Sequence, residues 1–319
     1  MTREKMIGFA CTRDGELVRF ERRNGSWEVA SALRDAGAQC VAASGSRVLV
    51  GTRGSGVLLS ADGGRAWERI QLPEADVYSV AIGAADGALY AGTEPSRLFV
   101  CRERGRWREL EALQEIPSRE EWSFPPRPWT HHVRWIAPDP HRAERLLVGI
   151  ELGGLMYSDD GGATFSDHRA GAKRDVHALA WHPRSGDRAY QAAGDGAAWS
   201  RDGGRSWEPV DAGRDLRYCW GLAVDPADPE RWYVSAASGP FAAHAGTEAE
   251  GRLYRWQGDA WQQLDLPGDS MPYALAATQA ELVAALADGR LLTSIDGGQS
   301  WEDTRMRVGS PLAMALADA

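Results

Sequence analysis

The stretch SRDGGRSW, residues 200–207, returns in nearly the same form at three other places in the chain. The other copies are SADGGRAW (60–67), SDDGGATF (158–165) and SIDGGQSW (294–301), and we call the four segments the Asp-Gly-Gly turns. An Asp followed by two glycines is typical of a tight β-turn, because the carboxylate accepts backbone N–H bonds and glycine adopts positive φ without steric cost. A phosphate-binding loop would need Gly-Lys-Ser/Thr opening a helix, and no Lys follows these glycines.

The aromatic residue that closes each turn has a regular spacing once three weaker copies of the turn are included. These aromatics are Trp27, Trp67, Trp107, Phe165, Trp207, Trp261 and Trp301. Successive members are 40, 40, 58, 42, 54 and 40 residues apart. Within each unit, short apolar runs separated by Gly, Pro and Asp are typical of four β-strands. The sequence therefore predicts an all-β protein, a single seven-bladed β-propeller of four-stranded antiparallel blades.

The two ends of the chain are complementary. The C-terminal run PLAMALADA (311–319) matches the first strand of a unit, and nothing follows it in the sequence. Residues 6–31 match the second, third and fourth strands of a unit without a first. We expect residues 6–31 and 306–319 to share one blade, so that the C-terminal strand pairs with the N-terminal blade and closes the ring. Closure removes free sheet edges and makes residues 1–319 one propeller domain.

The Asp-Gly-Gly turns resemble Asp-box (BNR) repeats, which occur in sialidases and in many other propellers. The resemblance gives Asp62, Asp160, Asp202 and Asp296 a structural role. Over the whole chain, and most clearly through HHVRWIAPDP (131–140), GIELGGLMYSDDGGATF (149–165) and DVHALAWHP (175–183), the sequence is similar to bacterial BNR or sialidase-like propellers of unassigned activity. It implies a fold but no reaction, since one fold carries many functions. Sialidases have six blades and an Arg-Ile-Pro stretch; this chain has seven units and no Arg-Ile-Pro, which argues against sialidase activity.

Composition and charge restrict the partners. The chain of 319 residues is 43% hydrophobic and 25% charged, as in ordinary globular proteins. A formal net charge of −9 argues against binding to nucleic acid or to an anionic membrane. No apolar run is long enough for a signal peptide or a membrane span. The four cysteines are scattered, without a Cys-x-x-Cys pair, so we expect free thiols in the cytoplasm.

Topology predicts which face of the propeller carries function. In a four-stranded meander, third-to-fourth turns lie on one face, whereas second-to-third turns and links between blades lie on the other. The Asp-Gly-Gly turns are third-to-fourth turns, and two insertions, residues 111–130 and 235–251, fall on the opposite face. Long loops on a rigid scaffold tend to carry function. In the first insertion Trp122, Phe124 and Trp129 beside prolines form either a lid over a site or a loop folded onto its own aromatics.

The register of the first strands predicts a ring of side chains at the mouth of the central channel. Its members are Cys40, Tyr78, His132, His177, Trp220, Tyr273 and Met314, and just outside it we expect His131, Asp175, Arg217, Tyr218 and Met271. Neighbours on a strand point to opposite sides, so only one of His131 and His132 is expected to reach the site. The position after the second strand holds Arg53, Glu94 and Glu151. The candidate catalytic residues are Glu94, Glu151, His177 and Tyr273, and the candidate ligand-binding residues are Arg53, Tyr78, Trp129, His131, His132, Arg134, Arg217, Tyr218, Trp220 and His244.

Three functions fit these residues. The first is a hydrolase or lyase acting on a carbohydrate or a similar polar small molecule, with Glu94 and Glu151 on adjacent blades as paired acid and base. The second is a metal-dependent enzyme in which His132, His177 and Glu151 hold a divalent ion. The third is a non-catalytic scaffold that binds a protein or peptide on the insertion-bearing face. A purely structural role is the alternative for each residue, since a histidine at the channel mouth commonly only forms hydrogen bonds and an acid in a turn is commonly only solvated.

Overall fold

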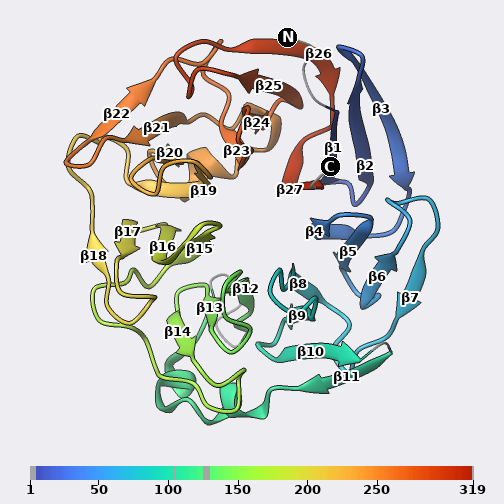
Figure 1. Ribbon diagram of the computed structural model, residues 1–319, viewed down its shortest axis with the longest axis vertical. Helices are drawn as coiled ribbons and strands as arrows, with labels where there is room; N and C mark the ends of the chain where they lie inside the picture. Colours follow the sequence, from blue (N-terminus) through green and yellow to red (C-terminus); the bar gives the residue numbers. More distant parts are fainter. Residues whose placement is uncertain (1–4, 104, 125–129, 318–319) are drawn as a thin grey trace.

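The computed structural model describes residues 5–103, 105–124 and 130–317 of the chain. In these residues seven antiparallel sheets stand around a common axis as the blades of a propeller, which confirms the predicted all-β, seven-bladed fold (Figure 1). Six sheets have four strands. The remaining one has three, and an isolated bridge between Tyr157 and Ser166 takes the place of its fourth strand.

The blades follow one another around the ring in chain order. The closing blade contains β27 (Pro311–Ala317), β1 (Met6–Thr12), β2 (Leu17–Arg23) and β3 (Ser26–Leu33). The next two contain β4 (Ala38–Ser44), β5 (Arg47–Thr52), β6 (Val57–Ser60) and β7 (Glu68–Ile70), then β8 (Val77–Ile82), β9 (Leu89–Thr93), β10 (Leu98–Glu103) and β11 (Arg106–Glu109). The three-stranded blade has β12 (Val133–Pro138), β13 (Leu146–Ile150) and β14 (Gly154–Ser158), and the next has β15 (Val176–His182), β16 (Ser185–Ala193), β17 (Gly196–Ser200) and β18 (Glu208–Pro209). The last two have β19 (Tyr218–Val224), β20 (Trp232–Ala237), β21 (Arg252–Trp256) and β22 (Trp261–Leu264), then β23 (Pro272–Ala277), β24 (Leu282–Leu286), β25 (Arg290–Ser294) and β26 (Glu302–Arg307).

The ring closes through the two ends of the chain. Strand β27 pairs antiparallel with β1, with Ile7 opposite Ala317 and Cys11 opposite Ala313, and the sheet order is β27-β1-β2-β3. The predicted pairing of the C-terminal strand with the N-terminal blade is therefore confirmed. The C-terminal contribution starts at Pro311, because residues 306 and 307 belong to β26 of the preceding blade.

The Asp-Gly-Gly turns share one pattern of hydrogen bonds. Each Asp carboxylate accepts a bond from the Ser hydroxyl two residues before it and from the backbone N–H four residues after it. The second glycine lies against the preceding blade: at Gly298 φ is +88°, and a Cβ there would lie 2.5 Å from Cδ1 of Leu264. The turns therefore fix blade-to-blade packing, which only a glycine permits at that position.

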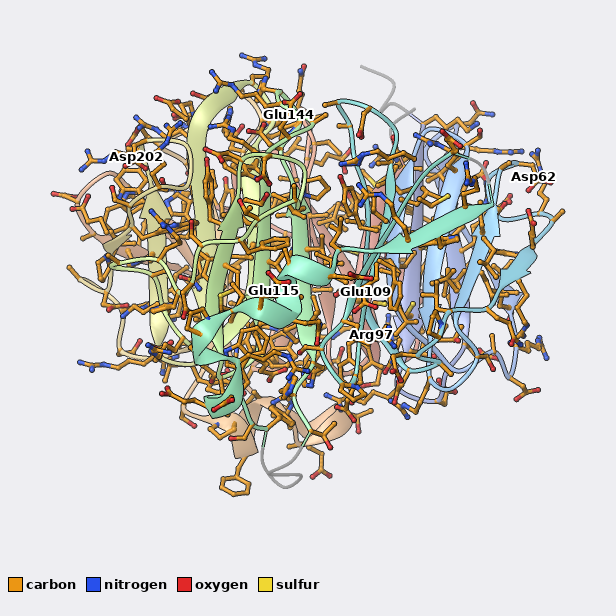
Figure 2. The ribbon with its side chains drawn as sticks, turned by 90° about the horizontal axis from the view of Figure 1, so that it is seen from below. Asp62, Arg97, Glu109, Glu115, Glu144 and Asp202 are labelled. Atoms are coloured by element: carbon orange, nitrogen blue, oxygen red, sulfur yellow. The ribbon has the colours of Figure 1, made fainter. Side chains whose placement is uncertain are left out.

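Short helices make up part of the two insertions. Helices η1 (Glu111–Glu115) and η2 (Pro117–Glu121) connect β11 to β12, and α1 (Pro240–Ala243) and η3 (Gly246–Glu248) connect β20 to β21. Trp122 is buried in the same core cluster as Leu113 and Ile116, so this part of the first insertion folds onto its own apolar residues. Seen from the side, Asp62 and Asp202 of the Asp-Gly-Gly turns lie toward the upper face of the disc, together with Glu144 (Figure 2). In the described part of the chain, the helices are all too short or too polar to cross a membrane.

Candidate functional site

The first strands of the blades line a cavity of about 110 Å³ on the propeller axis. Six members of the predicted mouth ring face it, namely Cys40, Tyr78, His177, Trp220, Tyr273 and Met314. The three-stranded blade contributes Arg134 instead of His132. His132 stands just before β12, is 1% exposed, and is turned sideways between two neighbouring turns.

Two carboxylates enclose the imidazole of His132. Its Nδ1 lies 3.3 Å from Oε2 of Glu94, which follows β9, and its Nε2 lies 2.6 Å from Oε2 of Glu151, which follows β13. Glu94 and Glu151 were expected to face a common substrate as acid and base. The ring of His132 occupies the space between them, so both carboxylates contact His132 instead of facing a shared ligand.

Glu151 is the most constrained acid of the cluster. Burial alone would raise the pKa of Glu151, but its contacts with His132, His177 and Arg134 hold that pKa well below its usual range. Burial likewise opposes the charged form of His132, yet the contacts with Glu151 and Glu94 raise the pKa of His132 above its ordinary value. Glu151 and His132 therefore each favour the charged form of the other, and Nε of Arg134 lies 3.4 Å from the same carboxylate oxygen.

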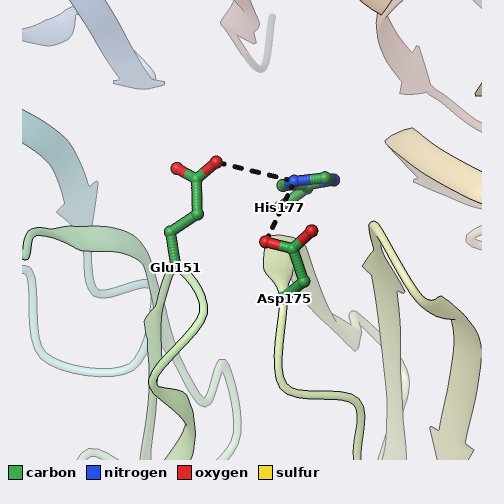
Figure 3. A group of neighbouring side chains, drawn as sticks. All are labelled: Glu151, Asp175 and His177. Atoms are coloured by element: carbon green, nitrogen blue, oxygen red, sulfur yellow. Dashed lines mark ion pairs between the residues drawn. The ribbon is translucent and has the colours of Figure 1, made fainter. Parts of the chain in front are cut away.

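His177 faces Glu151 from the next blade. Its Nδ1–H donates a 2.6 Å hydrogen bond to the carbonyl of Cys219, which points Nε2 toward two carboxylates. Nε2 lies 3.6 Å from Oε1 of Glu151 and 3.5 Å from Oδ1 of Asp175 (Figure 3). Asp175 directly precedes β15, and His177 lies at a register shift between Val176 and Ala178, where the structure brings the two side chains together. Burial opposes the imidazolium form, but the two carboxylates outweigh it and raise the pKa of His177 to about 9.

A wall of aromatic rings covers the other side of His177. The ring of His177 lies 4.4 Å from Trp220 and 4.9 Å from Tyr218, measured between centroids. His244, from the second insertion, is hydrogen-bonded through Nε2 to the Tyr218 hydroxyl at 3.2 Å and through Nδ1 to the Tyr273 hydroxyl at 3.1 Å. Desolvation, followed by the nearby charge of His177, lowers the pKa of His244 to about 4. A neutral His244 thus ties the insertion to the mouth.

Two arginines add positive charge beside this wall. The guanidinium of Arg134 lies 4.8 Å from the ring of Trp220, and that of Arg13 lies 4.8 Å from the ring of Tyr273. Nε and Nη2 of Arg13 are buried without a hydrogen-bond partner among the described residues. Sequence reasoning missed Arg13, although the signal was present: Arg13 directly follows β1, the second strand of its blade, which is the position that Arg53, Glu94 and Glu151 hold in theirs.

The remaining predicted residues are placed as follows. His131 is turned away from the cavity against Trp122, with ring centroids 5.5 Å apart, and burial together with Arg119 lowers the pKa of His131 to about 4. Only one of the two adjacent histidines therefore reaches the cluster. Tyr78 stacks on His132 at 4.0 Å and Phe124 approaches the same ring edge-on at 4.8 Å. Arg53 and Arg217 are exposed and do not line the cavity, and Trp129 lies outside the described residues.

The expected metal ligands are only partly brought together. His177 and Glu151 face one another, but both ring nitrogens of His132 point at carboxylates. Asp175 was expected only as a neighbour of the ring, but it is the third residue of the cluster. One donor atom each from Glu151, Asp175 and His177 lies within 4.8 Å of the other two.

Comparison with known proteins supports the fold. No protein-family model matches the chain, and no curated protein matches it. Among solved structures it is similar to an ancestral GH74 enzyme (17% identity, TM-score 0.66, 84% of this chain and 38% of the other) and to the GH74 xyloglucanase from Xanthomonas campestris (16%, 0.68, 98% and 52%). It is also similar to YCF48 bound to D1 peptide (16%, 0.60, 86% and 85%). At these identities the likeness shows a β-propeller, and the chain spans about half or less of the two GH74 chains.

Proposed function

We propose that the protein is an enzyme of hydrolase or lyase type that acts on a carbohydrate or a similar polar small molecule at the mouth of the channel, opposite the Asp-Gly-Gly turns. The observation that carries the proposal is the buried ionised cluster around Glu151. Placing such charges out of water costs several kcal/mol per ion. Unlike the buried pair Arg22–Glu281 between two blades, this cluster includes a residue that lines the cavity, His177. Groups with strongly shifted pKa values in a concave site are typical of catalysis.

The cluster divides into positioning and reacting groups. His132 and Arg134 hold one oxygen of Glu151, while the other oxygen faces His177. Glu151 and His177 are therefore the acid–base pair of the proposal, and the phenol of Tyr273 is a further donor on the cavity wall. Glu94 acts through His132 and is a positioning residue.

The cavity and its charges restrict the ligand. Pockets that bury drug-sized ligands measure roughly 300–1,000 Å³, so a cavity of about 110 Å³ admits one small group and not a long polymer segment. On the cavity wall the ring of Trp220 suits the apolar face of a sugar and Arg134 favours an anionic group, while Arg13 adds positive charge next to the wall residue Tyr273. The best substrate class is therefore a small acidic sugar or the acidic end group of a larger molecule. The GH74 enzymes support a carbohydrate substrate by fold analogy alone.

Turnover measurements on matched variants test the proposal. The purified chain is incubated with neutral and acidic mono- and oligosaccharides, and reducing ends (hydrolase) or unsaturated products (lyase) are followed. Glu151→Gln and His177→Gln should each lower turnover by roughly 10²–10⁴-fold, the usual contribution of acid–base catalysis. Glu144→Gln and His141→Gln, exposed residues outside the cluster, should not. Full turnover in Glu151→Gln with the fold intact would contradict the proposal.

A peptide-binding scaffold is the second candidate. Phe241 in α1 is 94% exposed beside the residues that His244 ties to the mouth, and an exposed large aromatic on a loop is a common interface anchor. YCF48, one of the similar structures, has a peptide bound. If this candidate is correct, Phe241→Ala weakens binding to a peptide library, whereas Glu151→Gln and His177→Gln do not affect it.

We propose further that the chain belongs with the Asp-box (BNR) propellers and works in the cytoplasm. Support for the first point is the hydrogen-bond pattern that the four Asp-Gly-Gly turns share. Support for the second is that all four cysteines are buried and form no disulfide in the described residues. Fractionation of cells that produce the tagged protein would test the location, and recovery outside the cytoplasm would contradict it.

A further inference from the structure

We infer that Glu151, Asp175 and His177 bind one divalent transition-metal ion, Mn²⁺ or Zn²⁺, at the mouth of the channel. The inference goes beyond the proposed function and rests on it only for the location of the site; with an ion bound, Glu151 and His177 would serve as its ligands and not as an acid–base pair. It replaces His132, the ligand expected from sequence, with Asp175. A cluster of acids alone would not carry it; the second observation is Nε2 of His177, a fully buried ring nitrogen that lies between the acids without a hydrogen-bond partner in the described residues.

The spacing of the three donors suits a metal ion better than a hydrogen bond. Nε2 of His177 lies 3.5 and 3.6 Å from the two carboxylate oxygens, beyond the 2.7–3.2 Å of N–H···O bonds. Ligands bound at about 2.0–2.1 Å around a tetrahedral ion are separated by roughly 3.3 Å. The two nitrogen–oxygen distances therefore need to shorten by only a few tenths of an ångström. All three donor atoms lie within 4.8 Å of one another. A small rotation of either acid can therefore bring the two carboxylate oxygens, the third pair of donors, to a similar separation.

Residues around the donors orient them. Metal-binding histidines usually donate their other ring N–H to a carbonyl or carboxylate, and Nδ1 of His177 donates to the carbonyl of Cys219 at 2.6 Å. This bond directs Nε2 at the acids, and an ion that binds there would take the place of the Nε2 proton, which is released to solvent. His132 holds Oε2 of Glu151 at 2.6 Å, which leaves Oε1 directed at His177. Both ligands are therefore held in place before an ion arrives.

Asp175 provides the open side of the site. Its side chain is 18% exposed, whereas the side chains of Glu151 and His177 are 7% and 0% exposed, so an ion would enter past Asp175. Gly194 lies directly beneath this carboxylate, and a Cβ there would overlap Oδ2 of Asp175. Because φ of Gly194 is not positive, alanine is compatible with the backbone and would act by displacing Asp175 and, to a smaller extent, the ring of Tyr218, whose Cε2 would lie 2.9 Å from the added Cβ.

The donor set selects the ion. Ca²⁺ takes six to eight oxygen ligands and Mg²⁺ prefers an octahedron of oxygens, whereas an imidazole with two carboxylates suits Mn²⁺, Fe²⁺ and Zn²⁺. Three protein ligands also leave a coordination position open, as catalytic sites do and structural sites do not. When bound there, such an ion supplies a Lewis acid or an activated water.

Binding of the metal alone tests the inference. The full-length chain is treated with a chelator and titrated with MnCl₂, and free Mn²⁺ is followed by electron paramagnetic resonance; ZnCl₂ is then added as a competitor. We expect one Mn²⁺ per chain, displaced by Zn²⁺. Asp175→Asn and His177→Gln should each weaken binding by at least roughly 100-fold, since they remove a ligand, and Gly194→Ala by roughly 10-fold, since it only displaces one.

Matched controls separate this site from surface binding. Asp159→Asn and His141→Gln alter an exposed acid and an exposed histidine outside the cluster and should leave the affinity unchanged. Circular dichroism melting verifies that each variant is folded. If His177→Gln does not fold, Asp175→Asn alone tests the inference. No saturable Mn²⁺ or Zn²⁺ binding, or equal binding by wild type, Asp175→Asn and His177→Gln, would overturn the inference. Stoichiometric binding without any turnover would support the metal site while contradicting the proposed enzyme, so the two failures are distinguishable.

Discussion

Asp296 illustrates how a single side chain stabilises an Asp-Gly-Gly turn. Oδ2 accepts the hydroxyl of Ser300 at 2.6 Å, and Oδ1 accepts the backbone N–H of Ser300 at 2.9 Å and the hydroxyl of Ser294 at 2.7 Å. These bonds, with the Ser300 hydroxyl first, lower the pKa of Asp296 to about 2. A carboxyl whose pKa is lower in the folded than in the unfolded chain, near 3.9, stabilises the fold fully above pH 4 and loses that effect as the pH falls toward 2.

The prediction at this scale is a pH-dependent difference between wild type and Asp296→Asn. Asparagine cannot accept the Ser300 hydroxyl at its nitrogen, so the variant should melt lower at pH 7, by roughly 1–2 °C because the group is exposed and screened by water. The difference in Tm should shrink toward zero between pH 4 and pH 2. Thermal melts at one-unit pH steps measure it. A difference that is unchanged at pH 2 would contradict the assigned role of the carboxylate.

Residues of the site were predictable where strand register alone places them. Cys40, Tyr78 and His177 lie on the channel because every blade starts with an equivalent first strand. His132 was misplaced by two residues: β8, β12 and β15 start at Val77, Val133 and Val176 with the same register shift after that residue, so Arg134 is the equivalent of Tyr78 and His177. The ligand role inferred for Asp175 depends on Glu151, a residue of another blade, and the sequence of one strand does not contain that information.

At the scale of elements, β27 is the strand on which closure depends. It pairs with β1, which without it would be a free edge, and it is the channel-lining strand of the closing blade. Unpaired edges promote aggregation. Removing residues 311–319 should therefore give insoluble protein, or soluble protein that melts at least about 5 °C lower, as judged by sedimentation and circular dichroism.

A rearranged chain is the control for this truncation. Ile7 is paired with Ala317, so residues 311–317 can be joined through a short Gly-Ser linker to residue 6 as a hairpin. This rearranged chain should recover solubility and melting, because it restores the same sheet. A truncated protein that melts like the full chain would show that β27 does not close the ring.

The elements were largely predictable because the turn chemistry repeats at a fixed period. The missing fourth strand of the blade β12–β14 was not. After the turn at residues 158–165, the carboxylate of Asp167 accepts the backbone N–H of Ser118 at 3.1 Å and also its hydroxyl, and His168 accepts the N–H of Leu155. Asp167 thus ties the segment to η2 of the insertion, while single bonds such as that from the N–H of Arg169 to the carbonyl of Leu155 hold it beside β14 without a continuous ladder. The contact with Asp167 comes from an insertion elsewhere in the chain, so the local sequence pattern does not predict the missing strand.

For the whole molecule, the seam between the last blade and the closing blade joins the most distant parts of the sequence. Its core cluster combines Phe20 and Met6 of the closing blade with Val283, Leu291 and Met306 of the last. Beside this cluster lies one buried ion pair between residues 259 positions apart, Arg22 in β2 and Glu281 before β24, with Nη1 2.8 Å from Oε2. Both side chains are 2% exposed.

Removing one charge of this ion pair is predicted to lower the free energy of unfolding substantially. Glu281→Gln removes the charge of the carboxylate that binds the buried guanidinium of Arg22, and breaking a buried ion pair on one side typically costs about 3–5 kcal/mol. Replacing both residues by apolar ones, Arg22→Met with Glu281→Leu, should recover most of that loss, because both buried charges are then removed. Glu103→Gln, which breaks an exposed pair with Arg106, should change the free energy of unfolding by less than about 1 kcal/mol. Urea unfolding of the four proteins measures these differences, and a loss below about 1 kcal/mol in Glu281→Gln would mean that apolar packing alone holds the seam.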